Sequence, residues 1–229
     1  MRSLISFFLR PRLTETTRDM LRRLYKDHKV RSYHDSRVVM YNFADCENNA
    51  IDLIYGGSTF DWKCGGSGIP SSTYVNAEHI VPQSFFKKQQ PMVSDLHHLF
   101  SSPSTLNNRR SNYKFKQMDY SQCSMFCKDN TCSYDVPSNP DSYSCLGQDK
   151  ASWMPIKKDR GEVARAIFYF FTMYDGVDIS SVGDVNTFKQ WNTQFPPSAR
   201  EIARNDAINK TQGNRNPYTD DYTLVNKAW

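Results

Sequence analysis

Apolar residues near the start of the chain repeat at helical spacing. They recur at three- and four-residue steps, with basic residues between them, at Leu13, Met20, Leu21 and Leu24. This period predicts an amphipathic helix from Thr14 to His28. Short β-rich runs follow at Val38 to Tyr41 and at Ile51 to Tyr55, where Gly56 ends the second run. These two runs predict strands.

The middle of the chain combines a glycine-rich loop with two short apolar runs. The runs are Ile80-Val81 and Leu99-Phe100, and a helix signal follows the second one. Ser102 is expected to cap that helix, because serine side chains accept hydrogen bonds from free N–H groups at helix starts. Pro103 suits the first turn, where its missing N–H would have no partner.

The second half is predicted to be mainly helical. Asp159 and Glu162 have the spacing of a capping box, and a wide apolar stripe behind them predicts a core helix. A further helix is expected from Val182 to Trp191. Ser198 and Glu201 form a second capping box that opens a helix reaching Lys210. Without a repeat or a linker, residues 1–229 are expected to form one α+β domain.

Composition narrows the class of protein only slightly. Aromatic residues make up 14% of the chain, which is typical of a globular protein. A net charge of +5 permits binding to nucleic acid but does not argue for it. No stretch reaches the ~18 apolar residues that span a bilayer. Leu4 to Leu9, within residues 1–12, has two interpretations: the remnant of a signal peptide, or an apolar segment that packs on the body.

Six cysteines predict disulfide bonds and an oxidising compartment. Cys46 and Cys64 flank one expected hairpin. Four more crowd a segment that looks rich in loops: Cys123, Cys127, Cys132 and Cys145. The alternative is a structural zinc site, since four cysteines can close a tetrahedral shell. The spacings favour disulfides because they contain no Cys-x-x-Cys pair, and the sequence leaves the pairing open.

Side chains suited to phosphodiester hydrolysis gather between residues 78 and 112. They are Glu78, His79, Asp95, His97, His98 and the tract Asn107-Asn108-Arg109-Arg110-Ser111-Asn112. A neutral imidazole takes a proton from attacking water. An oxygen-ligated cation neutralises phosphoryl charge, and arginine adds paired hydrogen bonds to the same group.

The order of the elements places these groups together. A strand carrying His79, a second strand from His97 to Phe100 and a helix from Pro103 to Arg110 predict a two-stranded hairpin followed by a helix. Asn107, one turn into that helix, is expected to face His79. Each histidine taken alone is as readily explained by a structural role, because short motif matches are only hypotheses.

Several ordered segments form a recognisable series: NAEHIVPQSFF (76–86), SDLHHLF (94–100), LNNRRSNYKF (106–115), Arg160-Gly161 with Ala164-Arg165, and RNDAINKTQGNRNPY (204–218). This series resembles the endonuclease I family, whose members are ββα-metal (His-Me finger) nucleases. The resemblance runs from about Tyr41 to Tyr218. A ββα-metal finger packed against the mainly helical C-terminal half is the fold that it implies.

The resemblance also implies a role for individual residues. It makes His79 the general base, and it makes Glu78 and Asn107 the protein ligands of a Mg²⁺ ion, which Mn²⁺ or Ca²⁺ can replace. His97 and His98 match positions that orient the site. Few protein ligands are expected, because Mg²⁺ keeps several of its waters.

Some positions depart from the family pattern or stay open. Ile80-Val81 stands where many relatives have Thr-Trp. An insertion that carries a phosphate-clamping arginine in one bacterial branch is absent, so Arg110 is assigned the clamp, with a solvated surface arginine as the alternative. Asn112, Gln212 and Asn214 are expected to position the site or the substrate, although a polar turn before Pro217 explains the last two almost as well.

Together these observations predict a secreted endonuclease, or one in another oxidising compartment. It should cleave DNA, and RNA as well, with little sequence preference, leaving 5′-phosphate ends. It is expected to act as a monomer without a protein partner or a membrane. Two alternatives stand: a nucleic-acid-binding protein whose finger has lost catalysis, and a structural zinc module held by cysteines.

Overall fold

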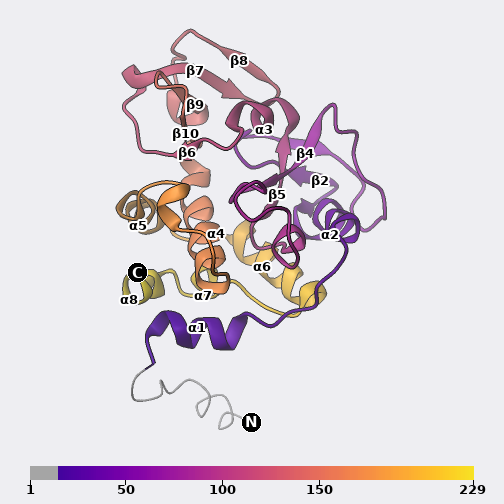
Figure 1. Ribbon diagram of the computed structural model, residues 1–229. Coiled ribbons are helices and arrows are strands. Elements are labelled where there is room, and N and C mark those ends of the chain that lie inside the picture. The colour runs from indigo at the N-terminus through magenta and orange to yellow at the C-terminus, as the bar shows by residue number, and fades with distance from the viewer. Residues whose placement is uncertain (1–14) are drawn as a thin grey trace.

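The computed structural model describes residues 15–229, and the expectations for residues 1–12 lie outside this part of the chain. About 43% of the chain is helical and 17% is strand, which confirms a mixed α+β fold. Helices gather toward the C-terminal end of the chain and strands toward its middle (Figure 1). Among residues 15–229, no helix combines the length and the apolar character needed to cross a bilayer.

Within residues 15–229 the strands form three small sheets. The first is antiparallel, in the order β1 (Cys46–Glu47), β2 (Ala50–Asp52), β3 (Thr59–Asp61). The second pairs β4 (Val75–His79) with β5 (Leu99–Pro103). The third has the order β6-β10-β9-β7-β8 and consists of β6 (Lys114–Phe115), β7 (Cys123–Lys128), β8 (Thr131–Ser133), β9 (Ser144–Gly147) and β10 (Ser152–Met154).

Eight α-helices are found in residues 15–229. They are α1 (Thr17–Tyr25), α2 (Tyr33–Val39), α3 (Ser104–Arg110), α4 (Arg160–Met173), α5 (Val185–Gln194), α6 (Ala199–Gln212), α7 (Pro217–Asp220) and α8 (Val225–Ala228). The expected helix at 14–28 is therefore shorter, and the one at 182–191 begins three residues later. Both begin where a side chain caps the first turn, at Thr16 and at Asp184.

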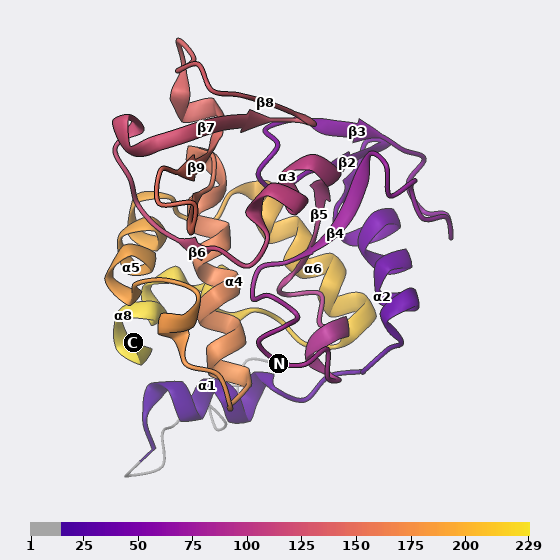
Figure 2. The same cartoon turned by 45° about the horizontal axis from the view of Figure 1, so that its top comes forward.

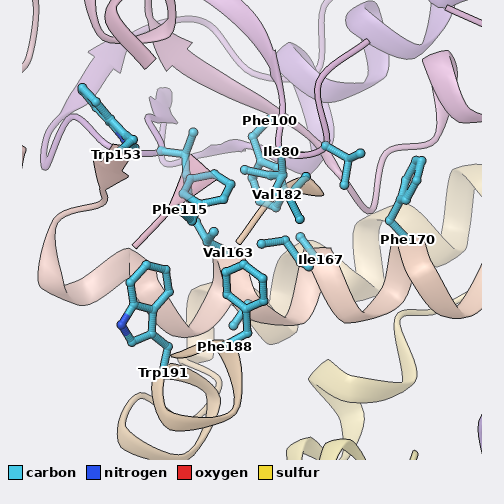
Figure 3. Packing of buried hydrophobic residues seen from close by; sticks show 14 of the residues in the cluster. Ile80, Phe100, Phe115, Trp153, Val163, Ile167, Phe170, Val182, Phe188 and Trp191 are labelled. Atoms are coloured by element: carbon cyan, nitrogen blue, oxygen red, sulfur yellow. The ribbon is translucent and has the colours of Figure 1, made fainter. Parts of the chain in front are cut away.

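Helix α4 is the centre of the core, because every one of its residues except Glu162 is buried. Its apolar side chains meet α5 on one side and strand residues on the other (Figure 3). Phe188 and Trp191 come from α5, and Phe100 and Phe115 from the strands. Gly161 lets α4 approach the end of α5, since an added Cβ would lie 2.1 Å from the carbonyl oxygen of Phe195.

Two of the expected secondary-structure assignments are wrong, because residues that flank the two segments determine their backbone conformation. Residues 38–41 are helical, at the end of α2 and in the π-helical turn Met40–Ala44, rather than a strand. Ser32 starts this helical stretch by accepting the Asp35 N–H. Residues 51–55 form a strand only as far as Asp52.

The expected helix caps fail where the side chains have partners far away in the sequence. Ser102 donates to the carbonyl of Ile54 and does not cap α3. Asp159 accepts the N–H of Tyr55 at 2.7 Å and makes no cap hydrogen bond to α4. Ser198 does cap α6, as predicted, but the Glu201 side chain pairs with Arg165.

All six cysteines are paired in three disulfides, which confirms the prediction of disulfide bonds. They join Cys46 to Cys64, Cys123 to Cys145 and Cys127 to Cys132. The alternative of a cysteine-bound zinc site is wrong, because no thiolate is left to bind a metal. The segment expected to be rich in loops is the five-stranded sheet, in which two of the bonds link β7 to β9 and to β8.

The two disulfides of this sheet should differ in their contribution to stability. They close loops with separations of 22 residues, for Cys123 and Cys145, and 5 residues, for Cys127 and Cys132. The entropy that a disulfide removes from the unfolded chain grows with loop length, so the longer loop should be worth about 1 kcal/mol more. Urea unfolding of the two paired Cys→Ser variants measures this difference. Equal losses, or a larger loss for Cys127→Ser/Cys132→Ser, would contradict it.

Candidate active site

The β4–β5 hairpin and helix α3 bring the predicted residues together. Glu78 and His79 pair with Phe100 and Leu99 across the hairpin, and α3 begins directly after β5. The helix lies beside β4 (Figure 2). Two side chains of α3 fix it there, because Asn107 Nδ2 donates to the carbonyl of Ala77 at 3.3 Å and Arg110 donates to the carbonyl of His79.

Glu78, His79 and Asn107 line one pocket of about 320 Å³. The remaining walls come from β4, from the turn after it, and from the end of α3 with the two residues that follow: Ala77, Pro82, Gln83, Ser84, Arg110, Ser111 and Asn112. The expectation that Asn107 lies near His79 is therefore met by the geometry. Asn112 is exposed at the rim of this pocket, within reach of a ligand that enters it.

The imidazole of His79 is held in a single tautomer. Its Nε2 lies 2.9 Å from the carbonyl oxygen of Val93, and a carbonyl oxygen only accepts, so Nε2 carries the hydrogen. The lone pair is consequently on Nδ1, which lies 2.9 Å from Gln83 Nε2. Burial, assisted by His98, lowers the pKa of His79 to about 3, so the ring is neutral near pH 7.

Glu78 is 3% exposed, and two donors hold one of its oxygens. The hydroxyl of Tyr55 donates to Oε1 at 3.0 Å, and a guanidinium nitrogen of Arg110 lies 3.2 Å from the same atom. Burial raises the pKa of Glu78 to about 7, although Arg110 opposes the shift. A cation brought to this carboxylate would restore the ionised form.

Arg110 is 1% exposed, and both of its terminal guanidinium nitrogens donate to protein acceptors. Besides Glu78, it donates to the carbonyls of His79 and Ile80, and its guanidinium lies over the ring of Phe115 at 4.6 Å. These contacts favour a residue that holds the Glu78 carboxylate over one that clamps a substrate phosphate.

His97 and His98 lie behind the pocket rather than in it. His98 Nε2 bonds to the carbonyl of Met92 at 2.6 Å, and its ring stands edge-on to that of His79, 5.4 Å between centroids. His97 Nε2 bonds to the carbonyl of Asn214 at 3.2 Å. The His98 bond therefore supports the segment around Val93 that holds His79, and the His97 bond ties its own backbone segment to Asn214.

Asp95 is the buried anchor of that segment. Its carboxylate accepts hydrogen bonds from the hydroxyls of Tyr169 and Tyr174, from Gln212 Nε2 and from the N–H of His97, at 2.6 to 3.0 Å. Although burial alone raises the pKa of Asp95, the neighbouring histidines and Tyr174 lower it to about 2. Sequence reasoning named Asp95 only as one of the acidic residues near the histidines, because its partners are up to 117 residues away.

Gln212 and Asn214 are also buried, away from the pocket. The Gln212 side chain bonds to Asp95, Asn214 and the N–H of Leu96, while Asn214 Nδ2 donates to the hydroxyl of Tyr169. These contacts hold the segment around Val93 in place. Of the roles expected for Gln212 and Asn214, their placement favours support of the site over contact with a substrate.

Sequence reasoning missed Tyr55 and Gln83. Tyr55 follows a short strand and is fully buried, yet nothing in the sequence links it to Glu78. Gln83 comes four residues after His79, but Pro82 breaks any regular period between them. Both contacts depend on how turns fold back over the pocket.

Two side chains that line the pocket have oxygen atoms suited to binding a hard cation. Tyr55 and Arg110 both hold Oε1 of Glu78, and Asn107 uses its Nδ2 for Ala77, which leaves Glu78 Oε2 and Asn107 Oδ1 as the acceptors. Carboxylate and amide oxygens are the ligands that Mg²⁺ prefers. Within residues 15–229, no group of three or more His, Cys, Asp or Glu side chains is arranged to hold a metal ion.

Comparison with known proteins identifies the family. The model of the family described as Endonuclease I matches residues 13–222. An extracellular ribonuclease of Bacillus amyloliquefaciens is 28% identical over 192 residues, 76% of this chain and 56% of the relative. An extracellular deoxyribonuclease of Aeromonas hydrophila is 23% identical over 246 residues, 95% and 93% of the two chains. Endonuclease-1 of Buchnera aphidicola is 23% identical over 234 residues, 86% and 84%.

The compartment follows from two findings. Relatives are named extracellular or periplasmic, and this chain contains three disulfides. Disulfides form and persist in oxidising environments. The prediction of a secreted protein, or one in another oxidising compartment, is confirmed.

The chain spans just over half the length of the Bacillus amyloliquefaciens relative.

Asp95→Asn should destabilise the protein in a pH-dependent way. Because the folded-state pKa of Asp95, about 2, lies below its ordinary value of 3.8, its stabilisation is present above pH 4 and is lost as the pH falls through 2. That shift corresponds to on the order of 2 kcal/mol. Unfolding by urea at pH 7, 4 and 2.5 should show wild type and variant converging toward low pH. A constant difference would rule out this role of Asp95.

Proposed function

The chain belongs to the endonuclease I family, and we propose that it is a divalent-metal-dependent endonuclease that hydrolyses phosphodiester bonds. The observation that carries the proposal is the placement of His79 Nδ1 in one pocket with the oxygen donors of Glu78 and Asn107. We propose that β4, β5 and α3 form a ββα-metal finger. The family match over residues 13–222 supports a single nuclease domain. We further propose that the protein acts as a monomer.

In the proposed reaction, His79 is the general base. With Nε2–H bound to Val93, its Nδ1 accepts a proton from a water that attacks phosphorus in line with the departing 3′ oxygen. The products then carry 5′-phosphate ends. The lowered pKa of His79 means that the imidazole is neutral near pH 7, so that Nδ1 has a lone pair when the substrate binds.

Glu78 and Asn107 are proposed to hold Mg²⁺, for which Mn²⁺ or Ca²⁺ can substitute. The bound cation would neutralise charge on the phosphate and stabilise the leaving oxygen. Tyr55 and Arg110 keep the Glu78 carboxylate oriented by holding Oε1. Arg110 is proposed to act through Glu78 rather than on the phosphate.

Both DNA and RNA are proposed as substrates, with little sequence preference. Relatives named ribonuclease and relatives named deoxyribonuclease both align with this chain. A site that binds a phosphate and a cation reads the backbone, which carries no direct sequence information. An inactive binding protein would be expected to lose a ligand or the base first, whereas Glu78, His79 and Asn107 are all in place.

Metal dependence tests the proposal. Purified protein should nick supercoiled DNA with Mg²⁺, stop on addition of EDTA, and produce ends that DNA ligase can rejoin. Asn107→Ala should raise the Mg²⁺ concentration needed for half-maximal activity at least ~10-fold, since it removes a direct ligand. Asn108→Ala, at the exposed neighbouring position, is the control and should match wild type. Activity that persists in EDTA, or an unchanged Mg²⁺ requirement in Asn107→Ala, would refute the metal site.

A further inference from the structure

The lone pair of His79 meets a side chain that the proposed reaction does not use. Gln83 Nε2 lies 2.9 Å from His79 Nδ1, and Gln83 lines the same pocket as Glu78 and Asn107. The residue belongs to the turn directly after β4 and is partly exposed. Since Nδ1 is the accepting nitrogen, the amide of Gln83 donates this hydrogen bond.

This hydrogen bond conflicts with general-base catalysis at the same atom. An imidazole nitrogen has one lone pair, which points outward in the plane of the ring and accepts along a single direction. A water that gives its proton to Nδ1 must lie along that direction, at about the distance at which the Gln83 amide nitrogen now lies. The amide and the attacking water therefore compete for one position. This inference rests on the proposed function.

The side chain of Gln83 has a second neighbour that holds it there. The phenol of Tyr33, the first residue of α2, interacts with Gln83, and the Tyr33 ring lies 5.6 Å from that of His79. Gln83 thus interacts with the side chains of both His79 and Tyr33. Because glutamine has three side-chain torsions and this one is partly exposed, its amide can swing away without movement of the backbone.

His79 does not need Gln83 to keep its orientation. The bond from Nε2 to Val93 fixes the ring, and the rings of Phe86 and His98 pack against it at 6.0 and 5.4 Å between centroids. Removal of the amide would leave these contacts intact. Its main effect would be to free the lone pair of Nδ1.

We propose that the amide of Gln83 occupies the place of the attacking water in the free protein, and that substrate binding must displace it. The glutamine would keep the catalytic lone pair of His79 bonded until a phosphate arrives. Activity would then be restrained by one hydrogen bond that is broken in every turnover.

Two variants of Gln83 test this inference. Gln83→Ala removes the amide, and Gln83→Met keeps the approximate length without a donor. Each should raise kcat/KM for cleavage of a short duplex by about three- to tenfold, because the free protein no longer has a hydrogen bond to break. Gln89→Ala, an exposed position near the same turn, is the control and should leave kcat/KM unchanged.

A structural measurement separates displacement from a general change in the pocket. In a high-resolution crystal structure of Gln83→Ala, an ordered water should lie within hydrogen-bond distance of His79 Nδ1, where wild type has the amide. Unchanged or reduced kcat/KM in both folded variants would overturn the inference. It would indicate instead that Gln83 helps to place the water. The proposed function fails separately, if wild type itself does not cleave nucleic acid.

Discussion

The hydrogen bond from His79 Nε2 to the carbonyl of Val93 is the interaction on which the candidate site depends. It decides which ring nitrogen keeps the lone pair, and it turns that nitrogen toward the pocket. The bond is only as rigid as the segment that carries Val93. That segment is tied to the C-terminal half through Asp95, which accepts hydrogen bonds from Tyr169, Tyr174 and Gln212. The long core helix α4 and the end of α6 thus hold the segment that orients His79, although they do not line the pocket.

A second constraint fixes the acidic side of the pocket. Glu78 is buried beside Arg110, and burial of two charges is unfavourable unless their remaining hydrogen-bonding groups are satisfied. Here Tyr55 donates to Glu78, and the carbonyls of His79 and Ile80 accept from the two terminal nitrogens of Arg110, which leaves only Arg110 Nε without a partner. The carboxylate is thus fixed with one oxygen held and the other available. Side chains from two other parts of the chain, Tyr55 and Arg110, therefore converge on Glu78. A buried carboxylate held in this way fits the proposed role of Glu78 as a cation ligand.

The sequence was sufficient for the local parts of the site. The spacing of apolar residues around His79, Leu99 and Asn107 predicted the hairpin and the helix, because strand pairing and helix placement there involve neighbours in the chain. Features that depend on distant partners were missed. Asp159 has the spacing of a helix cap but bonds to Tyr55 instead. The five-stranded sheet escaped prediction because its strands are two to six residues long and are held by disulfides as well as by apolar contacts.

The most direct test of this account is the nicking of supercoiled plasmid by His79→Ala, compared with His34→Ala, an exposed histidine of α2. Loss of the general base should slow cleavage about 10²- to 10⁴-fold. DNA affinity, measured in the presence of EDTA, should stay near that of wild type, and His34→Ala should cleave normally. Near-normal nicking by a folded His79→Ala protein would contradict the account, because the imidazole held by Val93 would then have no part in the chemistry.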